Sequence, residues 1–283
     1  MGRSVVITGA STGIGEACAL HLDRLGFDVF AGVRNEQDGD RLAESASDRL
    51  RPVTLDVTKP DQIGTAADLV KGEVGAAGLN GLVNNAGITV AGPVEFLPID
   101  DIRWQFEVNF LGPIAVTQAF IPLLREAQGR IVNMSSIGGR FSAPYVSAYN
   151  ASKFAMEAWS DSLRIELTPW NIDVSVVEPG NIKTPIWEKG IKEGLDRRKQ
   201  LPKEAEDLYG PVLDGLVAYA TKQGETGIPA QKVANAVLHA LTSDKPKTRY
   251  LVGPDAKQQA FIARWLPDRI RDKLVLSQIR RGG

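Results

Sequence analysis

Tyr149 and Lys153 are the two residues whose types and spacing first suggest chemistry. They stand four positions apart in the stretch Tyr149-Asn-Ala-Ser-Lys153, and residues i and i+4 of a helix share one face. A free tyrosine has a pKa of about 10, and a nearby ammonium ion lowers it by stabilising the phenolate. The pair could therefore exchange a proton with a substrate oxygen, although the same spacing also occurs on solvated helix faces.

A glycine-rich turn near the amino terminus has the composition of a phosphate-binding site. Thr8-Gly-Ala-Ser-Thr-Gly-Ile-Gly15 lies between a predicted strand and a predicted helix. Glycines at 9, 13 and 15 permit a tight turn and close backbone approach, and the helix N-terminus offers N–H groups to a phosphate. The members expected to bind a cofactor are Gly9, Ser11, Thr12, Gly13, Ile14 and Gly15. The spacing GxxxGxG differs from the usual dinucleotide fingerprint GxGxxG, so a purely structural turn is the alternative.

Arg34 bears on the choice of cofactor. It follows the second predicted strand, where an NAD site presents Asp or Glu to the ribose hydroxyls and an arginine suits a 2′-phosphate. Because guanidinium binds phosphate through a planar fork, Arg34 favours NADP(H) over NAD(H), with a solvated surface arginine as the alternative. The ends of strands three and four add Asp56, Val57, Asn84, Ala86 and Gly87 as expected cofactor contacts.

Short β-rich apolar runs alternate with longer amphipathic segments along the chain. The predicted strands are Ser4–Thr8, Asp28–Val33, Pro52–Leu55, Gly81–Asn84, Arg130–Met134, Val174–Glu178 and Tyr250–Val252. The predicted helices are Gly13–Leu25, Asp61–Val74, Trp104–Glu126, Ala148–Leu167 and Ala230–Thr242. This alternation predicts an α/β fold, a single-domain, Rossmann-like, doubly wound parallel sheet of about seven strands with helices on both faces.

Two regions interrupt that alternation. We expect residues 1–254 to form the catalytic domain, with a substrate-binding lid at about 181–228, because this segment is long, polar and punctuated by Gly and Pro. Residues 255–283 form a C-terminal extension with seven Lys or Arg against three Asp or Glu. Its apolar residues could lie on an anionic membrane surface, but packing over the active site or a partner subunit is favoured, and Pro267 should break the helix.

Composition narrows the class of function. The 283 residues carry a formal net charge of −1, which gives no reason to expect nucleic acid as a partner. Cys18 is the only cysteine and is expected in the core; His21 and His239 show no metal-ligand pattern, so no metal is expected. The first strand begins too early for a leader peptide, and no apolar run approaches the length of a membrane-spanning helix, so a cytoplasmic location is expected.

Taken together, these motifs resemble the short-chain dehydrogenase/reductase family over essentially the whole chain. The matching residues are Thr8–Gly15, Asn84–Gly87, Asn109, Ser135-Ser136, Tyr149–Lys153 and Pro179-Gly180. Val29–Leu42 and Ser160–Leu167 look like the branch that contains hydroxysteroid and retinol dehydrogenases. Members of the family usually form dimers or tetramers, so the resemblance implies a homodimer or homotetramer.

The resemblance also implies a catalytic role for four residues. Tyr149 would be the acid/base, and Lys153 would lower its pKa and hydrogen-bond the nicotinamide ribose. Ser136 would orient the substrate oxygen, and Asn109 would help to hold a water that links Lys153 to solvent. Pro179, Gly180, Ile182 and Thr184 match the segment that contacts the nicotinamide carboxamide. Alone, Ser136 could simply end a strand and Asn109 could be a buried polar residue.

The resulting expectation is an NADP(H)-dependent oxidoreductase acting on a carbonyl or secondary alcohol. Apolar lid residues suggest a medium-sized apolar substrate, such as a steroid, retinoid, fatty or aromatic carbonyl, although core packing explains many of them; they are Ile186, Trp187, Ile191, Leu195, Leu208, Val212, Leu213 and Leu216. The alternatives are an NAD-dependent dehydrogenase, a non-catalytic NADP(H)-binding regulatory module, and a cofactor-recycling epimerase or dehydratase. The last class generally carries a larger substrate domain than this C-terminus allows.

Overall fold

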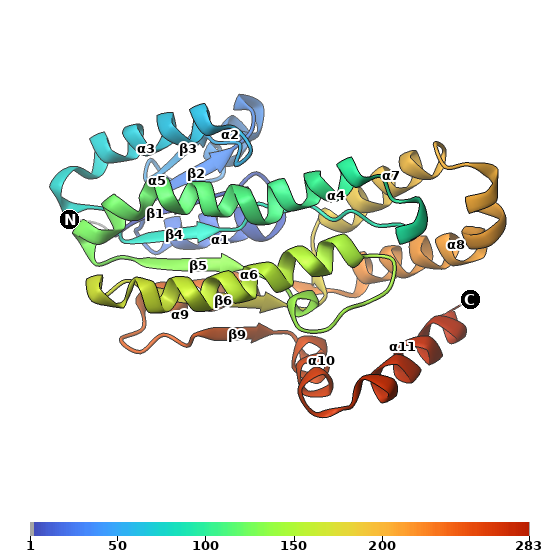
Figure 1. Cartoon of the computed structure of the whole chain (residues 1–283). Helices are drawn as coiled ribbons and strands as arrows, with labels where there is room; N and C mark the ends of the chain where they lie inside the picture. Colours follow the sequence, from blue (N-terminus) through green and yellow to red (C-terminus); the bar gives the residue numbers. More distant parts are fainter. Residues whose placement is uncertain (1–2, 283) are drawn as a thin grey trace.

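A seven-stranded parallel sheet forms the centre of the molecule (Figure 1). The computed structural model describes the backbone of residues 3–282 and the side chains of residues 3–277. Residues 1 and 2 of the predicted catalytic domain and residue 283 of the predicted C-terminal extension lie outside this part. The strand order is β3-β2-β1-β4-β5-β6-β9, so the chain reverses direction across the sheet between β1 and β4. This is the predicted Rossmann-like doubly wound fold, in which ligands bind beyond the carboxyl ends of the strands at that reversal.

The strands agree closely with those predicted from apolar runs. They are β1 (Ser4–Ile7), β2 (Asp28–Val33), β3 (Leu50–Thr54), β4 (Gly81–Asn84), β5 (Arg130–Met134), β6 (Asp173–Pro179) and β9 (Arg249–Val252). A separate pair, β7 (Ile182–Lys183) and β8 (Ile228–Pro229), lies outside the main sheet. The helices are α1 (Gly13–Arg24), α2 (Glu36–Ala43), α3 (Pro60–Val74), α4 (Ile99–Phe106), α5 (Gly112–Ala127), α6 (Ser147–Glu166), α7 (Ile186–Arg198), α8 (Lys203–Thr226), α9 (Gln231–Thr242), α10 (Pro254–Trp265) and α11 (Asp268–Gly282).

Two apolar layers hold the sheet between its helices. On one face, residues of α1 and α9 such as Leu22 and Val233 pack against the strands. On the other face, α3, α5 and α6 contribute residues such as Phe120 and Leu163. Cys18 is fully buried in the first layer, and burial raises the pKa of its thiol to about 12, which suits an inert core residue.

One long helix corrects an expectation from the sequence. Ile99–Ala127 is continuous through α4, a π-helical segment η3 (Glu107–Leu111), and α5. Within the described residues it is the one helix whose length and apolar composition would let it cross a membrane, so the statement that no run approaches that length was wrong. Half of its apolar window is buried in the fold, and Val116 and Phe120 are completely covered, as in a core helix.

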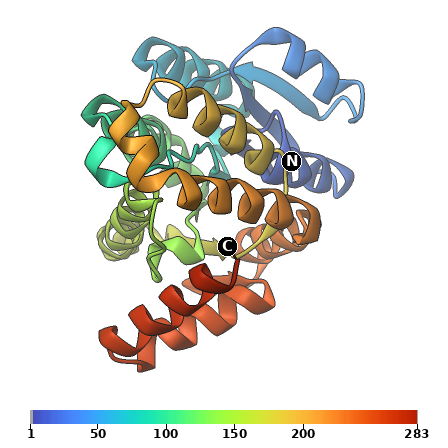
Figure 2. The ribbon, with the colours of Figure 1, turned by 90° about the vertical axis from the view of Figure 1, so that its right-hand side faces the viewer.

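The region predicted as a lid forms α7 and α8, which cross the end of the sheet toward which the strand arrows point (Figures 1 and 2). Pairing of β7 with β8 joins the two ends of this segment. Polar contacts tie it to the loop and helix after β4: Arg197 pairs with Asp101 at 2.5 Å, and the Tyr209 hydroxyl donates to Glu95 at 2.8 Å.

The C-terminal extension folds as two helices separated at Pro267. Helix α10 packs on β9 and on η4 (Ile137–Gly139), with Ala256 and Ala260 in one apolar cluster with Ile137. Helix α11 contacts α8 and lies below it in Figure 2. Phe261 and Trp265 remain 63% and 64% exposed, so part of the apolar face has no cover within the described chain.

Candidate active site

Tyr149 and Lys153 share one face of the first two turns of α6, as their spacing predicts. The Lys153 Nζ atom lies 5.8 Å from the centre of the Tyr149 ring. Only 5% of Lys153 is exposed, and its ammonium donates a hydrogen bond of 2.8 Å to the carbonyl oxygen of Met134 at the end of β5. The helix therefore places both groups at the carboxyl edge of the sheet.

Ser136 reaches the same point from the turn after β5. Its Oγ accepts a hydrogen bond of 3.0 Å from the amide of Gly138 and so caps η4. A Cβ atom at Gly138 would stand 3.1 Å from Tyr149 Cε1 and 3.4 Å from Ser136 Oγ. The missing side chain of Gly138 thus lets the serine turn and the tyrosine helix lie against each other.

The pKa values of this pair differ from the simplest expectation. Burial raises the pKa of Tyr149, and a hydrogen bond with Ser136 acts in the opposite direction. Burial also lowers the pKa of Lys153 to about 8, while the carboxylate of Glu157 opposes that change. Burial therefore acts against the lowering of the Tyr149 pKa that we expected from Lys153, and Ser136 is the group that favours the phenolate.

Asn109 lies in the π-helical segment η3, where it joins the loop after β4 to α6. Its Oδ1 accepts a hydrogen bond from the Ile88 amide at 2.8 Å, and its Nδ2 donates to the Ile88 carbonyl at 3.0 Å and to Ser152 Oγ at 3.3 Å. A Cβ at Gly87 would lie 3.5 Å from Asn109 Oδ1 and 3.8 Å from Lys153 Nζ. The structure thus brings Gly87, Asn109 and Lys153 together.

The glycine-rich turn precedes α1 as predicted and fits a bound dinucleotide. Gly9 and Gly13 have φ angles of 63° and 64°, a backbone conformation that favours glycine. Thr12 occupies the N-cap position without a side-chain cap bond, so the first N–H groups of α1 have no side-chain partner there and could bind phosphate.

Thr8 connects the glycine-rich turn to the end of β4 through hydrogen bonds. Its Oγ1 accepts hydrogen bonds of 3.0 Å from the amides of Asn85 and Ala86, and the Asn85 side chain donates to the carbonyls of Thr8 and Gly9. Neither Thr8 nor Asn85 stood among the predicted site residues. Asn84 did, but its side chain is buried and donates to Thr117 and Asn133. Asn84 therefore supports the helix layer, and the neighbouring Asn85 faces the turn.

Two cations contact the outer side of the turn, and a third follows the neighbouring strand β2. Arg34 is exposed directly after β2. Arg41 of α2, missed because α2 itself was not predicted, donates to the Ser11 carbonyl and pairs with Glu16 at 2.8 Å. Lys189 of α7 lies 3.4 Å from Thr12 Oγ1. They give the turn a basic border.

The remaining predicted cofactor residues divide between the edge of the sheet and its interior. Asp56 accepts hydrogen bonds from the amide and hydroxyl of Thr58 within its own turn. Val57 is buried against Gly112 of α5, so the Val57 side chain points into the core.

The segment that follows β6 runs through Gly180 and Ile182 to Thr184. A Cβ at Gly13 would lie 3.2 Å from Thr184 Cβ, which places this segment beside the glycine-rich turn. Asp255, not predicted, accepts from the Asn181 amide at 2.6 Å and fixes the segment from α10.

Comparison with known proteins gives a consistent result. The sequence profile of the short chain dehydrogenase family matches residues 3–193. Retinol dehydrogenase 5 of Mus musculus is 39% identical over 279 residues, which cover 96% of this chain and 87% of its own. The human 17-beta-hydroxysteroid dehydrogenase type 6 is 40% identical over 280 residues, with the same coverages. A short chain dehydrogenase from Burkholderia cenocepacia, solved in complex with NADP, superposes with a TM-score of 0.74 and 26% identity, covering 96% of this chain and 97% of that one.

Proposed function

The chain belongs to the short-chain dehydrogenase family, and from this premise we propose that it is an NADP(H)-dependent oxidoreductase acting on a carbonyl or secondary alcohol of a medium-sized apolar molecule. One observation carries the proposal: Tyr149, Ser136 and Lys153 converge at the carboxyl edge of the sheet, beside the glycine-rich turn. The nicotinamide cofactor, when bound, supplies or takes up the hydride.

Tyr149 and Ser136 would handle the oxygen of the substrate. Negative charge develops on that oxygen during reduction, and preorganised donors stabilise it. Tyr149 would donate the proton in reduction and accept it in oxidation, while Ser136 orients the oxygen. The half-buried position of the Tyr149 ring and the rigid turn at Gly138 support this division of labour.

Lys153 and Asn109 would connect Tyr149 with protons from solvent. The Lys153 ammonium is held by the Met134 carbonyl, and there we propose that it stabilises the Tyr149 phenolate and contacts the nicotinamide ribose. Asn109, fixed through both of its amide atoms to Ile88, would help to hold the water that connects Lys153 with solvent. A hydrogen-bonded side chain of this kind is preorganised for that task.

Cofactor preference is proposed from the basic border of the glycine-rich turn. Arg34 stands where a 2′-phosphate would lie in this fold, and its exposed guanidinium could bind that group through two hydrogen bonds. Arg34→Ala should weaken NADPH binding at least tenfold and leave NADH binding within twofold, as measured by titration of each cofactor. Tighter binding of NADH to the wild-type chain, unaffected by the substitution, would contradict the preference.

The substrate class is proposed from the relatives and from the lid. The similar curated proteins are named for retinol and for 17-beta-hydroxysteroids. In this chain an aromatic group borders the lid: the Tyr209 ring of α8 makes edge-to-face contacts with Phe96 and Tyr145 at centroid distances of 5.9 and 6.5 Å. Such a border suits an apolar ring system or polyene.

The test is oxidation of NADPH with a panel of retinoid, steroid and aromatic ketones and aldehydes, beside NADP reduction with the corresponding alcohols. Tyr149→Phe should abolish turnover and leave the NADPH dissociation constant within about twofold. An active Phe variant would refute the mechanism. Cofactor binding without turnover of any substrate would instead favour the non-catalytic regulatory module.

A further inference from the structure

Two carboxyl groups meet in the interior behind Lys153, and the proposed mechanism does not use them. Glu157 lies one turn beyond Lys153 on α6 and is 8% exposed; Glu178 lies near the end of β6 and is completely buried. A Cβ at Gly139 would stand 3.0 Å from the Lys153 carbonyl and 3.1 Å from Glu157 Cγ. The turn after Ser136 therefore packs directly on this part of α6.

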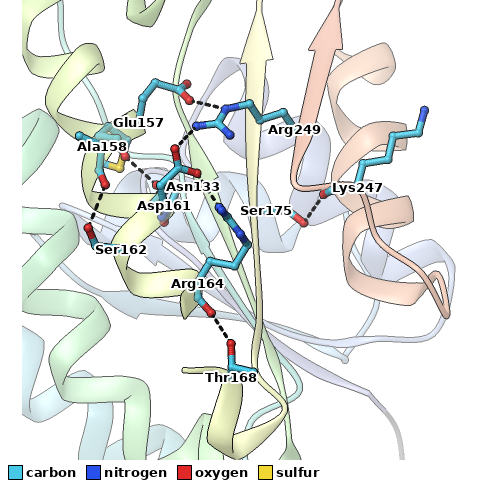
Figure 3. Close-up of polar contacts among 12 residues, drawn as sticks. Asn133, Glu157, Ala158, Asp161, Ser162, Arg164, Thr168, Ser175, Lys247 and Arg249 are labelled. Atoms are coloured by element: carbon cyan, nitrogen blue, oxygen red, sulfur yellow. Dashed lines mark hydrogen bonds and ion pairs between the residues drawn. The ribbon is translucent and has the colours of Figure 1, made fainter. Parts of the chain in front are cut away.

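One oxygen of each carboxyl group is held by arginine. Arg249 of β9 donates from Nε to Glu157 Oε2 at 3.0 Å and lies 3.4 Å from Glu178 Oε1. Arg140, from the end of the turn after β5, donates to Glu178 Oε1 at 2.8 Å. Figure 3 shows the Arg249 side chain reaching from β9 to Glu157 and Asp161 on α6. These bonds fix both carboxyl groups in place.

The other two oxygens have no such partner. Glu157 Oε1 and Glu178 Oε2 are buried and receive no hydrogen bond from any residue with a described side chain. Each buried polar atom left in this way costs free energy. Glu157 and Glu178 lie within hydrogen-bonding reach of each other, so a proton on one group can be donated to the other, because a protonated carboxyl donates where a carboxylate can only accept.

The electrostatics of the pair agree with this geometry. Burial, followed by the nearby charge of Glu157, raises the pKa of Glu178 to about 7. Two adjacent buried carboxylates repel each other, so the first proton added belongs to the pair as a whole. The charged groups that face the pair are Lys153 and Asp161 on α6, Arg140 after β5 and Arg249 on β9, with Arg164 bound to Asp161.

We propose that Glu157 and Glu178 form a proton-sharing carboxyl pair that serves as a positioning group for Lys153 and keeps its buried ammonium charged. The carboxylate of Glu157 is the group that opposes the effect of burial on Lys153, and it lies on the same helix face one turn away. When Glu178 holds the shared proton it is neutral, so the buried Glu157 carboxylate has no second negative charge beside it. The positioning role for Lys153 rests on the proposed catalytic function. The sharing of a proton between Glu157 and Glu178 does not depend on that function.

The first test needs neither substrate nor cofactor. Infrared spectra of the wild-type chain should show the carbonyl band of a protonated carboxyl group at pH 6 that disappears as the pH rises through about 7. That band should be absent at pH 6 from Glu178→Gln, whose amide can donate to Glu157 without titrating. No titrating band in the wild type, or an unchanged band in Glu178→Gln, would overturn the proposal even if every activity assay failed.

The second test is the pH profile of turnover. Glu157→Gln removes the charge beside Lys153, so the alkaline limb of the profile should move down by about one pH unit, with kcat close to wild type at pH 6. Asp161→Asn is the matched control, because Asp161 lies one turn farther along α6 and binds the same Arg249 at 2.7 Å; its alkaline limb should not move. Equal shifts in both variants, or none in Glu157→Gln, would refute the positioning role. Should Glu157→Gln fail to fold, Glu157→Asp should shift the limb in the same direction.

Discussion

Thr184 lies against Gly13, at the point where the segment after β6 closes over the glycine-rich turn. A Cβ atom at Gly13 would stand 3.2 Å from Thr184 Cβ, and the φ angle of Gly13 is 64°. Two segments far apart in the sequence therefore meet where both are expected to contact the cofactor. The backbone conformation favours glycine at position 13, and any larger side chain would also press on Thr184.

Gly13→Ala should therefore weaken cofactor binding. A left-handed alanine costs about 1–2 kcal/mol, and the added methyl group pushes Thr184 away, so we expect the NADPH dissociation constant to rise at least tenfold. Titration by fluorescence would measure it. Gly72→Ala is the matched control, since a Cβ at this exposed position of α3 meets nothing within 4 Å; it should leave binding unchanged and stabilise the fold by about 0.5–1 kcal/mol. Equal affinities in both variants would contradict this account of the turn.

Gly138→Ala should separate catalysis from cofactor binding. The added Cβ would stand 2.9 Å from Asn150 Oδ1 and 3.1 Å from Tyr149 Cε1, so the Asn150 amide must shift and the Tyr149 ring must give way. Misplacement by about 1 Å can cost on the order of a hundredfold in rate; the displacement of Tyr149 is smaller, so we expect a smaller loss in kcat with little change in NADPH affinity. Steady-state kinetics would check this. Gly190→Ala, in open space on α7, should keep full kcat; a wild-type rate in Gly138→Ala would show that the contact is not limiting.

Thr8→Val should destabilise the fold through its lost hydroxyl. Thr8 Oγ1 is fully buried and accepts from the amides of Asn85 and Ala86, and valine would leave both donors unpaired at nearly the same volume. We expect a loss of roughly 2 kcal/mol or more in the free energy of unfolding, measured by urea denaturation. Thr8→Ser, which keeps the hydroxyl, should recover most of it. A valine variant as stable as wild type would show that these amides find other partners.

The sequence was sufficient for most of the sheet because its central strands are continuous apolar runs. Strands buried on both faces, such as β4 and β5, have this pattern and were predicted to the residue. The first two residues of β3 were not predicted as strand, and Pro52 lies within β3, where it is tolerated because β3 is at the sheet edge. Helix α2 was missed because its polar sequence buries only Gly39 and Leu42.

The site was predicted less completely, for a geometric reason. Motif spacing identifies Tyr149 and Lys153, which lie within two turns of one helix. It does not say which face of β4 an asparagine occupies, and alternation sends Asn84 to the helix layer and Asn85 to the glycine-rich turn. Other features depend on contacts between elements that are distant in sequence, which only the fold reveals. They are the bonds of Arg41 and Asp255 to the site and the proximity of Glu157 to Glu178.

Lys153→Met should change the pH dependence of stability. Burial lowers the pKa of Lys153 from 10.5 to about 8 in the folded chain, so between these values the unfolded chain binds more protons and wild-type stability rises with pH. Below pH 8 the wild type carries the full cost of a buried ammonium.

The Lys153→Met variant has no such group, and its stability relative to wild type should be greater at pH 7.5 than at pH 10, by at most roughly 3 kcal/mol. The bond to the Met134 carbonyl is stronger for the ammonium than for the neutral amine, so its loss in the variant makes this difference smaller. Urea denaturation at several pH values would measure the difference, with the exposed Lys71→Met on α3 as a control that should show no such trend. A constant or reversed difference for Lys153→Met would mean that the fold does not disfavour the ammonium at this position.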